Sequence, residues 1–421
     1  MCKKLFNHTT TIIFFLCLLS LSVSAQQGTK KAIFIIADGI PADVVEKVAT
    51  PNLDAIAKEG GYRRAHVGGI KGTYSETPTI SAPGYNDLLT GTWGYKHNVW
   101  DNDIAAPNYN YHSIFRFFKD QYPQKKAAVF SSWEDNRTKL VGEGLPQAGN
   151  IHLDYHVDGL ELDTINFPHN KDGIYMHHID DSVVNAAAGY IKKEAPDLSW
   201  VYLEYTDDMG HGYGDGEKFY NAVKYMDDQV GRIWKSLQYR KENFGEDWLI
   251  VITTDHGRDA KTGQNHGGQS ERERTTWIVT NAKNLNEYFS TSQLAITDIL
   301  PTIAKHLELT IPKAQAWELD GVPFAGTVSV AQPEVMLQNE LLQIKWKSFQ
   351  HSGKVKIWLA STNNFKTGGE DKYELLGETA ISDEHFSIPF KNKNADVYKI
   401  VIEGEYNAVN RWIVMNEKKQ N

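Results

Sequence analysis

Six acidic and histidine residues stand in short polar motifs, most of which directly follow an apolar stretch of the chain. Carboxylate oxygens and imidazole nitrogens are ligands that Zn²⁺ and similar divalent ions accept. Any one motif, such as Asp207-x-x-Gly210-His211, also fits an ordinary turn, and a single histidine is more often structural than a ligand. Taken together, they suffice for two divalent ions with open coordination positions. The six residues are Asp38, Asp207, His211, Asp255, His256 and His266.

An alcohol group for nucleophilic attack comes from the segment that contains Ser81. Pro83 follows two residues later, and a helix-compatible run ends at Thr90-Gly91. Proline just inside a helix and glycine just past it predict that Ser81 lies at a helix N-terminus. Unpaired N–H groups and the helix dipole favour an anion there. A serine in this position is more often a simple N-cap, but the metal-type motifs elsewhere favour a chemical role.

The elements that must position these residues are buried strands alternating with helices. Continuous apolar runs such as residues 31–37 are typical of strands covered on both faces. The expected strands are residues 31–37, 127–131, 200–205, 248–253 and 276–280, and the expected helices are residues 50–60, 115–119, 179–193, 217–237 and 298–306. This alternation predicts an α/β fold with a mainly parallel sheet flanked by helices. A parallel sheet gathers its strand ends on one edge, so distant ligands should converge.

Two further regions differ from this pattern. Residues 135–175 are polar and weakly periodic, and we expect loops or an insertion over the site. After about Gly326, segments 342–346, 355–359, 385–388 and 398–402 alternate apolar and polar residues. This predicts a small C-terminal antiparallel β-sandwich domain, residues 335–421. It holds none of the six residues. We expect it to pack on the main domain, although carbohydrate binding is an alternative.

The N-terminus predicts export. Residues 1–25 combine a basic start, an apolar run too short to span a bilayer comfortably, and the small-residue cleavage site Val23-Ser24-Ala25. Both cysteines, Cys2 and Cys17, lie inside this signal peptide, so a metal site in the mature protein must use histidine and carboxylates. We expect a periplasmic or extracellular bacterial protein that is not bound to a membrane after cleavage. The net charge of −9 argues against a nucleic-acid polymer as partner.

The motifs resemble those of the alkaline phosphatase superfamily, most closely its nucleotide pyrophosphatase/phosphodiesterase branch, over residues 30–325. The branch places its nucleophile in P-T-x-[TS]-x-P followed by Thr-Gly, which matches Pro78 to Pro83 and Thr90-Gly91. The resemblance implies an alkaline phosphatase-like catalytic domain with two zinc ions. One zinc would be held by Asp207, His211 and His266, and the other by Asp38, Asp255, His256 and Ser81. Asn102 would bind a phosphate oxygen.

Two departures leave the substrate open. The nucleophile is serine where the branch usually has threonine, and Gly84-Tyr85 replaces the usual Asn-His. Sulfatases are related, but they need an arginine where this chain has Tyr85. They also favour a single Ca²⁺ held by carboxylates and amides, and three histidines suit zinc better.

The resulting hypothesis is a secreted two-metal hydrolase of small-molecule phosphate esters that forms a covalent phospho-seryl intermediate. Asn102 and the backbone N–H groups after Ser81 are expected to bind a non-bridging oxygen. Asn102 is neutral where an arginine would better match a dianionic monoester, which favours phosphodiesters and nucleotide pyrophosphates. A phosphomonoesterase or phosphonate hydrolase with the same site is the nearest alternative. A non-enzymatic carbohydrate-binding protein, suggested by 11 Trp and 20 Tyr, would not need these ligands.

Overall fold

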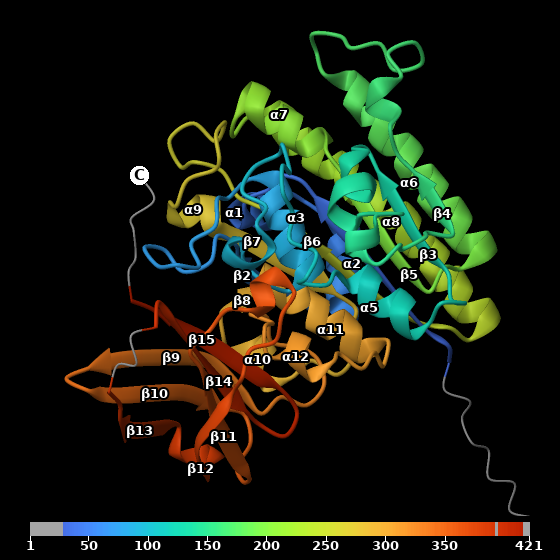
Figure 1. Cartoon of the computed structure of the whole chain (residues 1–421). Helices are drawn as coiled ribbons and strands as arrows, with labels where there is room; N and C mark the ends of the chain where they lie inside the picture. The colour runs from blue at the N-terminus through green and yellow to red at the C-terminus, as the bar shows by residue number, and fades with distance from the viewer. Residues whose placement is uncertain (1–27, 392–394, 416–421) are drawn as a thin grey trace, which may run out of the picture.

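The centre of the molecule is an eight-stranded sheet flanked by helices (Figure 1). The structure is a computed structural model, and it describes residues 28–391 and 395–415. The strand order is β4-β3-β5-β1-β6-β7-β2-β8. The strands are β1 (Lys30–Ala37), β2 (Gly61–His66), β3 (Ala127–Ser131), β4 (Tyr155–Val157), β5 (Leu198–Leu203), β6 (Asp247–Thr253), β7 (Thr275–Thr280) and β8 (Leu294–Ala295). Only β7 runs antiparallel to its neighbours, which confirms the mainly parallel sheet.

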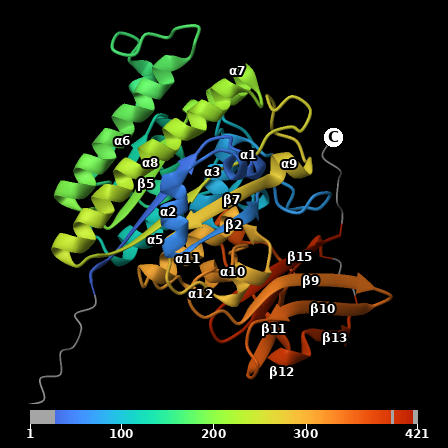
Figure 2. The same cartoon turned by 180° about the vertical axis from the view of Figure 1, so that it is seen from behind.

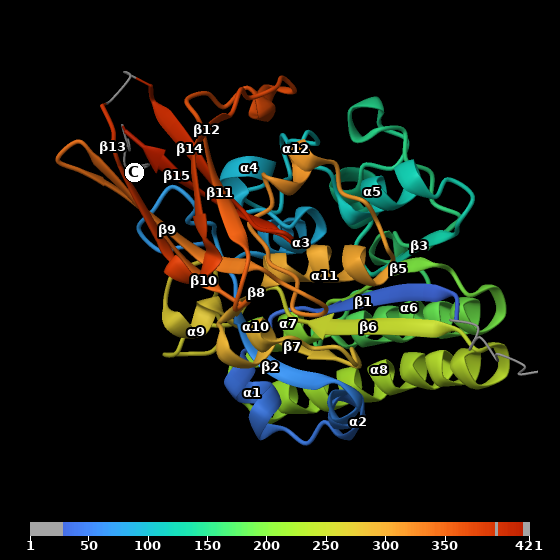
Figure 3. The same ribbon diagram turned by 90° about the horizontal axis from the view of Figure 1, so that it is seen from below.

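Alternate residues of β1 enter two separate cores, one on each face of the sheet. Phe34 and Ile36 pack with α3 (Ser81–Thr90), α5 (Ile114–Gln121) and α11 (Ile299–His306). Ile33 and Ile35 pack with α2 (Pro51–Glu59), α6 (Ile174–Glu194) and α8 (Glu217–Phe244). The two helical layers lie on opposite faces of the sheet in Figure 3, and α6 and α8 lie side by side in Figures 1 and 2. Burial on both faces explains why these strands read as unbroken apolar runs.

One expected strand ends earlier than the sequence indicated. Residues 200–205 were expected to be extended, but β5 ends at Leu203 and α7 (Tyr205–Tyr213) begins almost at once. Asp207 therefore lies in the first turn of a helix, and not in a loop after a strand. The remaining helices are α1 (Ala42–Lys47), α4 (Gly94–His97), α9 (Glu271–Arg274), α10 (Glu287–Thr291) and α12 (Lys313–Ala316).

The irregular region 135–175 divides into two parts. The first contains η1 (Asn136–Val141), η2 (Pro146–Ala148) and β4, which adds an edge strand to the sheet. After η3 (Leu160–Leu162), the chain forms a loop that projects beyond the N-terminal end of α6 (Figure 1). The expected loops are present, but part of the region completes the sheet.

The C-terminal region is built from two antiparallel sheets, as predicted. One has the order β13-β10-β9 and the other β12-β11-β14-β15. The strands are β9 (Val330–Gln338), β10 (Leu341–Ser348), β11 (Lys354–Ala360), β12 (Glu374–Ala380), β13 (His385–Pro389), β14 (Val397–Glu403) and β15 (Ala408–Val414). β9 begins before residue 335, the expected start of this domain. One apolar core runs continuously from α3 and α11 into these sheets, so the region packs firmly on the rest.

In the described part of the chain, no helix has the length and apolar character that crossing a bilayer requires. The predicted signal peptide, residues 1–25, lies outside the described residues.

Candidate metal centre and nucleophile

Ser81 is the first residue of α3, a helix whose residues are all buried and which ends at Gly91 with φ of +64°. The N-cap position belongs to Ile80, and no side chain caps this helix end, so the N-cap alternative for Ser81 was wrong. The Ser81 side chain is free for another role. The residue is 7% exposed, and its Oγ lies 3.5 Å from Nε2 of His256. The alcohol therefore faces the expected ligands.

Asp38, Asp255 and His256, which we call the inner group, lie at the ends of two paired strands. The parallel register of β1 and β6 aligns Ile36 with Thr253, so its continuation places Asp38 opposite Asp255. Oδ1 of Asp38 and Oδ2 of Asp255 each lie 3.3 Å from Nε2 of His256. All three residues are buried, and their ligand atoms lie within 4.8 Å of one another.

Each inner carboxylate uses one oxygen for protein hydrogen bonds and leaves the other without one. Oδ2 of Asp38 accepts from the hydroxyls of Tyr85 and Tyr202, the latter at 2.7 Å. Oδ1 of Asp255 accepts from the Gly39 N–H at 3.1 Å. The other oxygens, Oδ1 of Asp38 and Oδ2 of Asp255, are buried and have no hydrogen-bond partner among the described residues. Leaving such atoms unpaired is costly, and a cation between them would remove the cost.

The imidazole of His256 is oriented to complete this group. Its Nδ1 lies 2.9 Å from the carbonyl oxygen of Gly257, so Nδ1–H donates there and the Nε2 lone pair faces the two carboxylates. Burial raises the pKa of Asp255 well above its usual range, and the nearby charge of Asp38 adds to the effect. Burial alone would lower the pKa of His256, but the charges of Asp255 and Asp38 raise it to about 9. Both shifts favour bound protons in the metal-free group, and a divalent cation would take the place of these protons.

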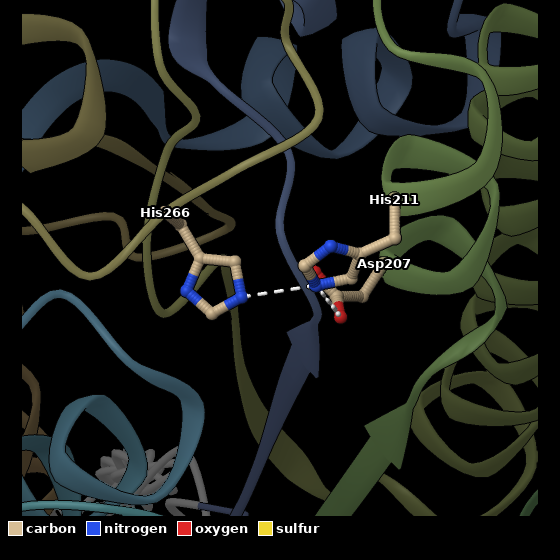
Figure 4. Close-up of side chains that lie close together, drawn as sticks. All are labelled: Asp207, His211 and His266. Carbon is tan, nitrogen blue, oxygen red and sulfur yellow. Dashed lines mark hydrogen bonds and ion pairs between the residues drawn. The ribbon is translucent and has the colours of Figure 1, made fainter.

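Asp207, His211 and His266, the outer group, come together from α7 and the loop after β6 (Figure 4). The i,i+4 spacing within α7 puts Asp207 and His211 on one helix face. Nε2 of His211 lies 3.2 Å from Oδ2 of Asp207 and 3.1 Å from Nε2 of His266. Nδ1 of His266 lies 3.0 Å from the carbonyl oxygen of Thr79, so its Nε2 lone pair points at the group. A set of two imidazole nitrogens and one carboxylate oxygen is suited to binding zinc.

The charges around the outer group differ from those of the inner one. Burial acts to raise the pKa of Asp207, but the hydrogen bond with His211 and the charge of Arg258 hold it well below its usual range. The hydrogen bond to Asp207 raises the pKa of His211. Burial, together with the charge of His256, lowers the pKa of His266 to about 4. An ionised carboxylate beside a neutral His266 is the protonation state that metal binding needs.

The two groups adjoin each other at one edge of the sheet. The rings of His256 and His266 stack, with centroids 3.8 Å apart and planes 14° from parallel. All six predicted ligands and Ser81 therefore meet in one place. His211 is the most exposed of them, which puts the outer group nearer to solvent than the inner group.

Asn102 lies beside the start of α3, but one expectation about this region was wrong. The backbone N–H groups after Ser81 were expected to be free for a phosphate oxygen. The Ala82 N–H instead donates to Oδ1 of Asn102 at 3.0 Å, and residue 83 is proline, which has no N–H. Among the described residues, the N–H of Ser81 itself and Nδ2 of Asn102 donate no hydrogen bond. These two groups are the donors that remain beside the serine.

Three residues that contact the ligands were not identified from the sequence as part of the site. Tyr85 and Tyr202 bind Asp38, and Arg258 binds Asp207. Arg258 directly follows the Asp-His-Gly motif, which could have drawn attention to it. The roles of the two tyrosines depend on contacts between distant segments, so no local pattern marks them.

A mainly parallel sheet with one Asp/His group at its strand ends, a second on an adjoining helix and loop, and a serine at a helix N-terminus is the arrangement of the alkaline phosphatase superfamily. Within it, the chain belongs to the type I phosphodiesterase / nucleotide pyrophosphatase family, whose model matches residues 32–272, more than half of the sequence.

The similar proteins of known name are consistent with this family, but their sequence identity to this chain is low. Human ectonucleotide pyrophosphatase/phosphodiesterase family member 5 is 25% identical over 252 residues, covering 58% of this chain and 49% of its own. The bis(5'-adenosyl)-triphosphatase enpp4 of Xenopus laevis is 25% identical over 247 residues, covering 55% and 48%. The chain thus spans about half the length of these relatives. The structure of the human member 5 protein covers 67% of this chain and 96% of its own, with 16% identity and a TM-score of 0.48, a similarity too low to bear on function.

Proposed function

We propose that the protein is an exported two-metal hydrolase of small-molecule phosphate esters that cleaves phosphodiester or nucleotide pyrophosphate bonds. The observation that carries this proposal is the position of Ser81, whose Oγ faces His256 at the point where both ligand groups meet. Asp38, Asp255 and His256, with Ser81, would hold one ion, and Asp207, His211 and His266 the other. The mixed nitrogen and oxygen donors favour zinc.

Divalent ions bound here would lower the pKa of the Ser81 hydroxyl and of water, and would stabilise the charge on phosphate oxygens. Ser81 Oγ passes its proton to water and attacks phosphorus in line. The bond from phosphorus to the leaving oxygen breaks, and that oxygen takes up a proton from water. Water then attacks the phospho-seryl phosphorus, which releases a phosphate monoester and returns the Ser81 hydroxyl. One proton of the attacking water returns to Ser81 Oγ and the other stays on the monoester or passes to solvent, so the net reaction is hydrolysis.

Two neutral donors would bind the non-bridging oxygen during both steps. The Ser81 N–H and Nδ2 of Asn102 lie beside the nucleophile and have no other partner among the described residues. Donors fixed in this way stabilise charge without having to reorganise. The nearby cation Arg258 is fully buried, and it donates to Gly39, Asp207 and Gln264. Arg258 is therefore not available to bind a dianionic monoester. This arrangement favours the singly charged phosphoryl group of a diester.

The alternatives have less support from the site. A phosphomonoesterase or phosphonate hydrolase would use the same groups, but it would gain from a cation free to bind a dianion, and Arg258 is already engaged. The naming of one relative as a bis(5'-adenosyl)-triphosphatase also favours a pyrophosphate-type substrate. The sulfatase hypothesis needs an arginine at position 85, whereas the Tyr85 hydroxyl is bound to Asp38.

The test compares three substrates on the protein reconstituted with zinc. Bis-p-nitrophenyl phosphate and a nucleotide p-nitrophenyl ester should be hydrolysed with higher kcat/KM than p-nitrophenyl phosphate. Ser81→Ala should retain its metal but lose this activity by at least about three orders of magnitude, as removal of a catalytic nucleophile does. Faster turnover of the monoester would contradict the diesterase assignment, and an active Ser81→Ala would contradict the mechanism.

Export and domain organisation are parts of the same proposal. We expect the mature protein to begin after Ala25 and to reach the periplasm or the medium, which N-terminal sequencing and cell fractionation would test. The catalytic domain would span residues 30–325, and the sandwich, residues 335–421, would serve as a packed accessory domain.

A further inference from the structure

Arg258 is among the largest fully buried side chains of the protein, with 0% exposure. Arginine is rarely buried unless its charge is paired and its N–H groups are hydrogen-bonded. It follows Asp255-His256-Gly257 directly, so its backbone belongs to the loop that leaves β6. A guanidinium held in this place needs partners from the surrounding segments.

Those partners come from the other segments that carry metal ligands. Nε donates to the carbonyl oxygen of Gly39 at 2.9 Å, and Gly39 follows the ligand Asp38. Nη2 donates to the backbone oxygen of Asp207 at 2.8 Å and also to its Oδ1. Nη1 donates to the carbonyl oxygen of Gln264 at 3.1 Å, two residues before His266. One side chain thus connects the end of β1, the start of α7 and the loop that bears His266.

Two glycines make room for this guanidinium. A Cβ at Gly210, inside α7, would lie 2.2 Å from Cζ of Arg258, and a Cβ at Gly39 would lie 2.6 Å from its Nη2. Glycine inside a helix costs about 1 kcal/mol relative to alanine. The glycine of the Asp-x-x-Gly-His motif therefore lies where the arginine passes closest to the helix.

The contact with Asp207 decides which of its oxygens faces the metal position. Arg258 occupies Oδ1, and Oδ2 then faces Nε2 of His211 at 3.2 Å. The inner carboxylates are fixed differently, because Asp38 accepts from two tyrosine hydroxyls and Asp255 from the Gly39 N–H. Of the three carboxylates, only that of the outer group depends on a buried cation for its orientation.

We propose that Arg258 is a positioning residue for the outer ion: it holds Asp207, and through Gln264 the loop of His266, in the geometry that binds this ion. The inner ion keeps its own anchors and does not depend on Arg258. This inference rests on the two-metal site proposed above, and it adds that the two ions respond differently to the loss of one residue.

The experiment is a zinc titration of the metal-free protein against a chromophoric chelator, with metal content measured after dialysis. Wild type should bind two equivalents. Arg258→Met should keep one equivalent at wild-type affinity and bind the second about 10- to 100-fold more weakly, as is typical when a group that orients a metal ligand is lost. Arg258→Lys should not restore the second ion, because a single ammonium cannot reach three segments.

A matched control shows whether the loss of any buried arginine weakens binding of the second ion. Arg240 on α8 is also buried and pairs with Glu246 through two contacts, at 2.6 and 2.9 Å. Arg240→Met should lower stability but retain both equivalents. Equal loss of the second ion in this variant would overturn the proposal, because the loss would then follow general destabilisation.

Gly210→Ala provides the second variant, because Arg258→Met leaves an unfilled buried space and could fail to fold. Alanine favours helix, so without the arginine contact this change would stabilise α7. We expect it instead to displace the guanidinium and to weaken the second equivalent. Unchanged binding of both ions in Arg258→Met or in Gly210→Ala overturns this inference alone. Fewer than two equivalents in wild type overturns the two-metal proposal as well.

Discussion

Lys96→Met should destabilise the whole protein, because Lys96 joins the α/β region to the C-terminal sheets. The side chain is 0% exposed, and Nζ donates to the backbone oxygen of Glu318 at 2.6 Å, Oδ1 of Asp320 at 2.7 Å and Oδ1 of Asn410 at 3.0 Å. Asn410 belongs to β15, whereas Lys96 belongs to α4. Methionine fills the space of the lysine side chain as far as Cε, but it lacks the charged Nζ and all three of its hydrogen bonds.

The expected loss of stability depends on the hydrogen bonds that Asp320 keeps in the variant. Breaking a buried ion pair by removing one partner costs about 3–5 kcal/mol. Asp320 still accepts from the Trp93 N–H and the Tyr95 hydroxyl, so we expect the lower end, about 3 kcal/mol. With an unfolding entropy of about 2.1 cal/mol/K per residue, this lowers the Tm of the chain by roughly 3 °C.

Guanidinium unfolding followed by tryptophan fluorescence, together with calorimetry, would measure this loss. A single transition should move as a whole, because one apolar core extends from α3 into the C-terminal sheets. Lys30→Met is the control: Lys30 pairs with the exposed Glu308 at 2.8 Å, and its loss should cost less than about 1 kcal/mol. A loss below about 1 kcal/mol for Lys96→Met, or a separate early transition of the sandwich, would refute the reasoning.

Two further predictions concern buried carboxylates. Burial raises the pKa of Asp298 to about 7, although its carboxylate accepts hydrogen bonds from Val322, Ala295 and Tyr288. The folded state therefore holds this proton more tightly than the unfolded state, in which the pKa of the carboxyl is near 3.8. The resulting stabilisation is lost as the pH rises from about 4 to 7. The stability advantage of wild type over Asp298→Asn, measured by urea unfolding, should shrink over that range, and a growing advantage would contradict the sign. Tyr202→Phe removes one of two hydroxyl donors from Asp38 Oδ2 and should destabilise the metal-free protein by about 1.5 kcal/mol. The double variant with Tyr85→Phe should lose more than the sum of the single losses, because the oxygen is then unpaired; strictly additive losses would show that each hydroxyl acts alone.

The sequence predicted the convergence of the six ligands because five of them lie in motifs that follow expected apolar strands. Apolar strands of this kind form parallel pairs, as β1 and β6 do. The sequence did not predict the helix that carries Asp207 and His211. Residues 200–205 are apolar except for Glu204 and were expected to be extended as far as Tyr205, although the i,i+4 spacing of the two ligands is a helical signal. The partners of Arg258 could not be predicted, since each contact joins segments that only the folded sheet brings together.

Some strands of the C-terminal region were predicted from the sequence and others were not, again because part of the pattern depends on pairing in the folded protein. Residues 342–346 alternate clearly and form the middle strand of their sheet, whereas β9 was not singled out. Pro333 lies within β9, and proline normally argues against a strand. β9 is at the edge of its sheet, where a missing N–H is tolerated, and its position becomes clear only from its pairing with β10.

The antiparallel direction of β7 has a consequence for how the centre is assembled. β6 and β7 are adjacent, and their pairing from Val251–Thr280 to Thr253–Ile278 closes the base of the excursion 254–274. That excursion leaves and re-enters the sheet at the same edge, and it supplies residues of both candidate ligand groups together with Arg258. Asp255, His256, His266 and Arg258 are therefore close in sequence, so this part of the centre can come together early in folding.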